Sequence, residues 1–172
     1  MPTLKSRTRA VYDRLSYSAA CLSGALLYSI LGWTHPRHQG VRVWAPAREA
    51  RIIREAIDYL IKVDPQLYLS LATKWQPTLC YSKYPRLGRL YKLFFINDSV
   101  LAWEPEGVAS YILYALLTLQ MLEDVGWPHV SQSVADETAR LVWGRIFEWS
   151  TKHGVSPELC DCYLDASKPR SK

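Results

Sequence analysis

A run of sixteen residues without a charge, from Gly107 to Leu122, constrains the fold of this chain more than any other feature. Leu, Ala, Met and Gln favour a helix, and the apolar side chains fall on every side of it rather than on one stripe. Protein must therefore enclose this helix, which is too short to be a bilayer span. We expect a buried central helix with amphipathic helices packed around it.

The length of 172 residues and the apolar content of 49% allow one well-packed core. We expect a single helical domain over residues 1–172, with frayed polar ends at about 1–5 and 166–172. No signal peptide is recognisable, because the apolar stretch from Ala19 to Trp33 is broken by Ser, Gly and Tyr and lacks a convincing cleavage site. These features favour a cytoplasmic protein.

The sequence offers little for catalysis or for binding a metal. The cysteines are too scattered for a disulfide framework, and Cys160 and Cys162 have neither a second Cys pair nor a near His at zinc-site spacing. We find no nucleophile with a base at suggestive spacing, no Gly-rich phosphate loop and no paired carboxylates. We expect a protein that is not an enzyme and that needs no cofactor and no metal.

Charge is distributed unevenly along the chain. Residues 1–92 carry fifteen Lys and Arg against five Asp and Glu, whereas residues 93–172 carry six against eleven. No acidic residue occurs from Pro65 to Asn97, and basic side chains alternate there with aromatic ones. Such a pattern binds phosphates and stacks on bases, so a nucleic-acid-binding protein is one prediction. The same side chains can equally form the solvated face of helices, or a surface that meets acidic lipids or an acidic partner.

Hydrophobic periodicity and capping residues predict about seven helices and thus an all-α fold. The first contains apolar residues at a spacing of three to four: Val11, Leu15, Ala19, Leu22, Leu26 and Ile30. The helices are expected from about Ser6 to Leu31, from Pro46 to Asp64, through Leu67 to Trp75, from about Pro85 through Phe94, from Pro105 to near Gly126, from Ser131 or Ser133 to about Lys152, and from Pro157 to Leu164.

Several segments resemble the homology motifs of the Bcl-2 family of apoptosis regulators. Residues 11–17 (Val-Tyr-Asp-Arg-Leu-Ser-Tyr) are similar to the amino-terminal motif of the family. Ile53, Ile57, Asp58 and Leu60 look like the BH3 motif, with Asp58 in the place of the family's Asp. The continuation over residues 63–68 (Val-Asp-Pro-Gln-Leu-Tyr) resembles the segment that follows this motif in the Bok branch.

The carboxy-terminal half is compared with the same family. The apolar helix over residues 108–122 and Trp149 followed by Gly154 fall where the family has its buried helix and its second homology motif. Residues 102–107 (Ala-Trp-Glu-Pro-Glu-Gly) replace the family's Asn-Trp-Gly-Arg, so the Arg that pairs with the Asp of a BH3 ligand has no counterpart. Arg86 and Arg89 are candidates to replace it.

The resemblance implies a Bcl-2-like bundle with a hydrophobic groove that accepts the BH3 helix of a partner. By position, the groove residues would be Leu67, Leu71, Trp75, Leu90, Phe94, Val108 and Ile112. The implied function is regulation of apoptosis by binding BH3-containing Bcl-2 family proteins. The resemblance also implies that this binding can take place at the mitochondrial outer membrane. A helical nucleic-acid-binding protein that uses the basic amino-terminal half is the alternative.

Overall fold

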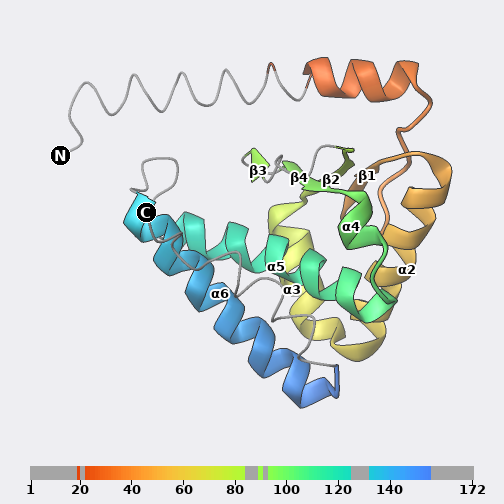
Figure 1. Ribbon diagram of the computed structural model, residues 1–172. Coiled ribbons are helices and arrows are strands. Elements are labelled where there is room, and N and C mark those ends of the chain that lie inside the picture. The colour runs from red at the N-terminus through yellow and green to blue at the C-terminus, as the bar shows by residue number, and fades with distance from the viewer. Residues whose placement is uncertain (1–18, 20–21, 84–88, 91–92, 125–131, 156–172) are drawn as a thin grey trace, which may run out of the picture.

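The computed structural model describes residues 19, 22–83, 89–90, 93–124 and 132–155. In this part of the chain a small β-sheet lies between one helix above it and a group of helices below it (Figure 1). The upper helix comprises residues 22–30 and is called the N-terminal helix. The other elements are β1 (Arg42–Trp44), α2 (Ala47–Val63), α3 (Pro65–Trp75), β2 (Thr78–Tyr81), β3 (Arg89–Leu90), β4 (Leu93–Ile96), α4 (Asp98–Leu101), α5 (Pro105–Asp124) and α6 (Gln132–His153).

The sheet has the strand order β1-β2-β4-β3. Strands β1, β2 and β4 are parallel, with Val43 beside Leu79 and Leu79 beside Phe94, and β3 pairs antiparallel with β4. Successive side chains of a strand point to opposite faces. Val43, Leu79 and Phe94 therefore share the face that packs against the lower helices. The other face carries Trp44, Cys80 and Leu93, which pack against the N-terminal helix.

The sheet shows that the prediction of an all-α, Bcl-2-like bundle is wrong. Residues 93–96, expected at the end of a helix, form β4, and the connection expected after Trp75 contains β2. Their sequences, Leu-Phe-Phe-Ile and Thr-Leu-Cys-Tyr, are short apolar runs rich in aromatic and β-branched residues, which is typical of buried parallel strands. The three-residue spacing of Leu87, Leu90 and Leu93 imitates a helix and led to the error.

The predicted central helix is confirmed as α5. Val108, Ile112 and Leu116 are each fully buried on it, and α2, α3 and α6 all pack against it. The lower core also includes the apolar side of α2, with Ile53 and Ile57 at 0% exposure. Enclosure by three helices and the sheet explains how a helix that is apolar on every side is stable in water.

The ends of the lower helices follow local rules that the sequence displays. Asp64 caps α3, because its carboxylate accepts a hydrogen bond from the backbone N–H of Leu67 at 3.1 Å, and Pro65 occupies the first turn. The α6 helix stops at His153, where Gly154 takes a φ of 68°. The predicted last helix, residues 157–164, and the predicted frayed ends, 1–5 and 166–172, lie outside the described residues.

Candidate docking surface

The N-terminal helix ends in a glycine-based cap that turns the chain back onto the sheet. Gly32 has a φ of 66°, a conformation that glycine adopts without strain. The N–H of Gly32 donates to the carbonyl of Ser29 at 3.0 Å, and the N–H of Trp33 donates to the carbonyl of Tyr28 at 2.7 Å. These two hydrogen bonds define a Schellman motif, and the rings of Trp33 and Tyr28 make the apolar contact that accompanies it, with centroids 5.9 Å apart.

Tyr28 fixes this helix to the sheet. Its ring stacks on Trp44 of β1 with a centroid distance of 5.6 Å, and its hydroxyl donates to the carbonyl of Tyr81 in β2 at 2.7 Å. Burial, with a smaller contribution from the nearby Cys80 thiol, raises the pKa of Tyr28 from 10.0 to about 12, so the hydroxyl remains a donor into the alkaline range. One side chain thus links the helix to two neighbouring strands.

Small residues allow the helix to lie close to the sheet. Gly24 faces the indole of Trp44, where an added Cβ would lie 3.4 Å from a ring carbon. Ala25 packs against the same cluster of Trp44, Cys80 and Leu93. The side of the helix that meets the sheet is therefore formed by its small residues and Tyr28, and its larger aliphatic residues point elsewhere.

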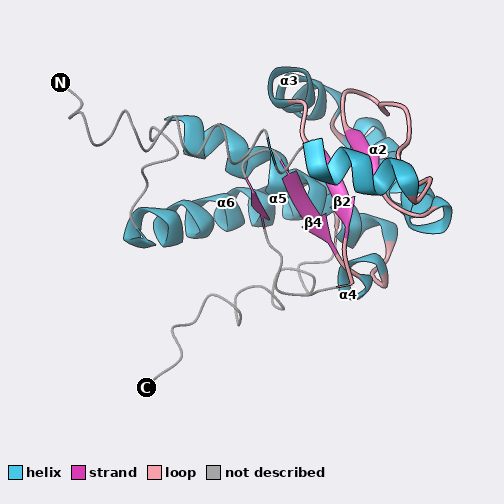
Figure 2. Ribbon diagram, turned by 90° about the horizontal axis from the view of Figure 1, so that it is seen from above, coloured by secondary structure: helices cyan, strands magenta, loops and turns pink. Residues whose placement is uncertain are grey.

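The outer face of the N-terminal helix is apolar and exposed. Leu22 and Ile30 are each 74% exposed and Leu26 is 64% exposed, with Leu27 and Leu31 beside them. We call these five residues the outer face, and Figure 2 looks down on their helix as it lies across the strands. On α2, by contrast, charged side chains occupy the exposed positions: Arg48, Arg51, Glu55, Asp58 and Lys62. An exposed apolar patch of this kind marks an interaction surface.

The edge segment, residues 33–41, connects the N-terminal helix to β1 and covers the edge of β1 that does not pair with β2. The N–H of His35 donates to the backbone carbonyl of Val43, and the N–H of Ala45 donates to the backbone carbonyl of Trp33. The segment ends in a two-residue hairpin turn in which Gln39 and Gly40 both have positive φ, 49° and 87°. A covered edge cannot pair with a strand of another molecule.

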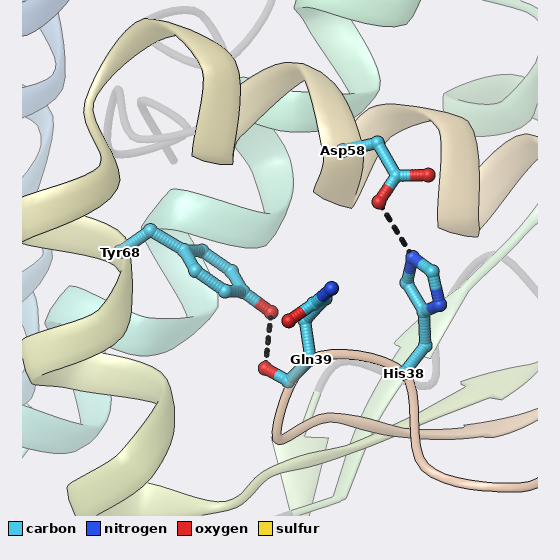
Figure 3. Close-up of polar contacts among 4 residues, drawn as sticks. All are labelled: His38, Gln39, Asp58 and Tyr68. Atoms are coloured by element: carbon cyan, nitrogen blue, oxygen red, sulfur yellow. Dashed lines mark hydrogen bonds and ion pairs between the residues drawn. The ribbon is translucent and has the colours of Figure 1, made fainter.

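Two side-chain contacts hold this hairpin on the lower helices (Figure 3). The Nε2 of His38 lies 2.7 Å from the Oδ1 of Asp58 on α2, and the hydroxyl of Tyr68 on α3 donates to the carbonyl of Gln39 at 3.0 Å. Burial, and to a lesser extent the charge of Asp58, raises the pKa of Tyr68, which keeps its hydroxyl protonated. The His38–Asp58 and Tyr68–Gln39 contacts together fix the position of the edge segment, which leads directly from the N-terminal helix.

The residues expected to line a BH3 groove lie mainly in the closed core. Leu71, Trp75, Phe94, Val108 and Ile112 are all buried in the cluster beneath the sheet, and Leu67 packs against it half-buried. The structure brings these residues together, but as core rather than as an open groove. Arg89 and Leu90 belong to β3, whose side chains are not described, and Arg86 lies outside the described residues.

The BH3-like motif is an ordinary amphipathic helix in this fold. Ile53, Ile57 and Leu60 are at most 1% exposed and form the inner side of α2. Asp58 is on the outer side, where its carboxylate meets His38. The motif therefore has its apolar side occupied by the protein's own core.

The described part of the chain is expected to hold no metal site, and its helices can be assessed for membrane spans. Its residues include no group of three His, Cys, Asp or Glu side chains placed to hold a metal ion. Among the same residues, no helix combines the length and the apolar character needed to cross a membrane.

The chain shows no match to any known protein family model, and neither curated proteins nor solved structures include one that is detectably similar. The candidate site therefore depends on geometry and charge alone.

The outer face was missed at the sequence level, although a signal for it exists. Leu22, Leu26 and Ile30 were recognised as a periodic stripe, and such a stripe ordinarily faces the core. No Asp, Glu, Lys or Arg occurs between Arg14 and Arg37, so this interval is free of those charges over a longer stretch than the central helix. Since α5 fills the core beneath the sheet, the N-terminal helix packs on the other face of the sheet with one side, and its other apolar side is exposed.

Proposed function

We propose that this protein associates peripherally with a lipid membrane, and that the outer face of the N-terminal helix is the surface that enters the bilayer interface. The observation that carries the proposal is the exposure of five large aliphatic side chains, four on the N-terminal helix and Leu31 in the turn that ends it. Interfacial helices bind membranes by burying such a face at the boundary between head groups and acyl chains. BH3 binding stays a prediction supported by the motif resemblance alone.

A lipid phase suits this face better than a protein partner does. Protein interfaces carry about one hydrogen bond per 100–200 Å² and a polar rim. The side chains of Leu22, Leu26, Leu27, Ile30 and Leu31 offer no hydrogen-bonding group. Ser23, which is exposed beside them, donates its hydroxyl to the carbonyl of Ala19 at 2.9 Å. An acyl chain requires no polar partner from the protein, and hydrogen bonds inside the helix satisfy the backbone.

The size of the face sets the expected strength of binding. Complete burial of a Leu or Ile side chain contributes about 1.5–3 kcal/mol, and these five side chains are between about half and three-quarters exposed. Their transfer into lipid would then contribute roughly 5–9 kcal/mol. That range is comparable with a single fatty-acyl anchor, which gives reversible attachment. The N-terminal helix is already fixed to the sheet by Tyr28, so little further ordering opposes binding.

The test is binding to lipid vesicles that contain phosphatidylcholine and phosphatidylglycerol, measured by co-sedimentation. The double variant Leu26→Glu/Ile30→Glu places two charges in the outer face without touching the core. We expect it to bind vesicles at least about 100-fold more weakly than the wild type, because each substitution removes apolar transfer and adds a charge that resists the interface.

Leu141→Glu is the matched control, since Leu141 is 49% exposed on α6, away from the N-terminal helix. It should bind as the wild type does, and circular dichroism should show all three proteins folded. Equal binding by wild type and double variant would refute the proposal. A wild-type dimer that the double variant converts to a monomer, without any vesicle binding, would also refute it and would identify a second copy as the occupant.

A further inference from the structure

We infer that the membrane this surface recognises is anionic, and that the layer of the protein carrying the outer face is built with a one-sided charge for that purpose. This inference rests on the proposed membrane association. No aspartate or glutamate occurs between Asp13 and Glu49 or between Asp64 and Asp98. Those two intervals contain the N-terminal helix, the edge segment and strands β1, β2 and β4.

The fold brings most of these two remote intervals into one layer, whereas α3, at the start of the second interval, lies among the lower helices. β1 from the first interval pairs with β2 from the second, and the N-terminal helix lies over both through Tyr28 (Figure 1). The acidic residues of the described chain lie on or beside the lower helices, for example Glu55 on α2 and Glu148 on α6. The elements of the upper layer themselves carry basic side chains and no carboxylate. Two carboxylates of neighbouring elements meet this layer from below, since Asp98 accepts a hydrogen bond from the Tyr81 hydroxyl and Asp58 contacts His38.

Three exposed basic side chains belong to the upper layer in the described structure. Arg42 and Trp44 are two residues apart in β1, so their side chains point to the same face of the sheet, on which the N-terminal helix lies. Arg37 in the edge segment contacts the side chain of Gln76, close to the start of β2. Lys83 is exposed at the other end of β2, two residues after Tyr81. The carbonyl of Tyr81 accepts the hydrogen bond from Tyr28.

Electrostatic attraction would supply the second signal that stable attachment requires. An apolar surface equivalent to one acyl chain holds a protein only reversibly, and a basic patch beside it converts this into firm binding to acidic membranes. Each Lys or Arg near the surface of an anionic leaflet strengthens binding about fivefold. Arg37, Arg42 and Lys83 together would therefore contribute about 100-fold.

The experiment compares the full chain on phosphatidylcholine vesicles with and without phosphatidylglycerol, at about 0.05 M and about 0.5 M salt. We expect the anionic vesicles to bind about 100-fold more tightly at low salt, and high salt to remove most of that difference. The triple variant Arg37→Gln/Arg42→Gln/Lys83→Gln should lose the preference for anionic lipid and keep the weaker binding to neutral vesicles.

A second triple variant controls for net charge. Arg51→Gln/Lys62→Gln/Arg145→Gln removes the same charge from exposed positions on α2 and α6, in the lower part of the molecule. It should keep most of the preference for anionic vesicles. Equal losses in both triple variants would overturn the inference, because net charge rather than the one-sided layer would then govern binding.

The remaining outcomes separate this inference from the proposed function. Equal, salt-independent binding to both vesicle types would overturn the anionic preference and leave membrane association standing. Failure to bind either vesicle would overturn both. Tighter binding to mixed-sequence single-stranded DNA than to anionic vesicles, reduced by the Arg37/Arg42/Lys83 variant but not by Leu26→Glu/Ile30→Glu, would overturn both in favour of a nucleic-acid-binding surface.

Discussion

Replacement of Tyr28 by Ala should release the N-terminal helix from the sheet while the rest of the protein stays folded. The variant loses the hydrogen bond to the Tyr81 carbonyl, which contributes about 0.5–1.5 kcal/mol. It also loses the stacking on Trp44, worth about 0.5–1.5 kcal/mol, and the burial of a half-buried ring, worth about 1–1.5 kcal/mol. The sum is about 2–4.5 kcal/mol. This loss affects the contact between the N-terminal helix and the sheet, because Tyr28 packs on the upper cluster and not in the lower core.

Hydrogen exchange of backbone amides measures this release directly. A loss of about 2–4.5 kcal/mol should accelerate exchange of the amides of residues 25–30 by roughly 30- to 2,000-fold, whereas the amides of α5 should exchange at nearly the wild-type rate. Tyr28→Phe keeps the ring and should show only the smaller effect of the lost hydrogen bond. Leu27→Ala, at a position 56% exposed on the outer face, is the matched control and should leave exchange unchanged.

Two results would contradict this reasoning. Exchange of residues 25–30 within about twofold of the wild type in Tyr28→Ala would mean that Tyr28 is not the anchor. Equal acceleration in the N-terminal helix and in α5 would mean that the helix does not open independently, and the layered description of its stability would be wrong.

Two further predictions concern the core and alkaline pH. Leu116 is 0% exposed on α5, so Leu116→Ala should lower the free energy of unfolding, measured in urea, by about 2.7–5 kcal/mol. Leu141→Ala, at the surface, should change it by less than about 0.5 kcal/mol. Similar losses in both variants would show that α5 is not the centre of the core. Burial raises the pKa of Tyr111 to about 12 from 10.0, so its contribution to stability should be complete below pH 10 and should fall between pH 10 and 12, where the unfolded chain releases the proton first. Urea unfolding over that pH range should show a shallower decline for Tyr111→Phe, and an unchanged slope would contradict the assignment.

The lower helices are the part of the fold that the sequence predicts well. Asp64 and Pro65 separate α2 from α3 by capping chemistry that acts within one turn, and Gly154 ends α6 in the same local way. The burial of α5 follows from composition alone, because a charge-free helix of that length has to be enclosed. Each of these features depends on neighbours within a few positions along the chain.

The sheet could not be deduced in this way. Short apolar runs such as residues 78–81 and 93–96 fit a buried strand or a turn of helix equally well by pattern. What makes them strands is their pairing, and the partners are remote: Arg42 lies beside Thr78, and Thr78 lies beside Leu93. Parallel pairing requires a long crossover, so no local signal reports it.

The sequence by itself determined that the chain has a buried central helix, that α2, α3 and α6 form, and that its basic and acidic residues are separated along the chain. Only the tertiary structure decided which side of the N-terminal helix meets the sheet. The periodic stripe of Leu22, Leu26 and Ile30 faces outward, because Gly24 and Ala25 allow closer approach to Trp44 and Tyr28 reaches the carbonyl of Tyr81. Periodicity states that a helix has an apolar side, but the shape and hydrogen-bonding groups of its neighbour decide which side is buried.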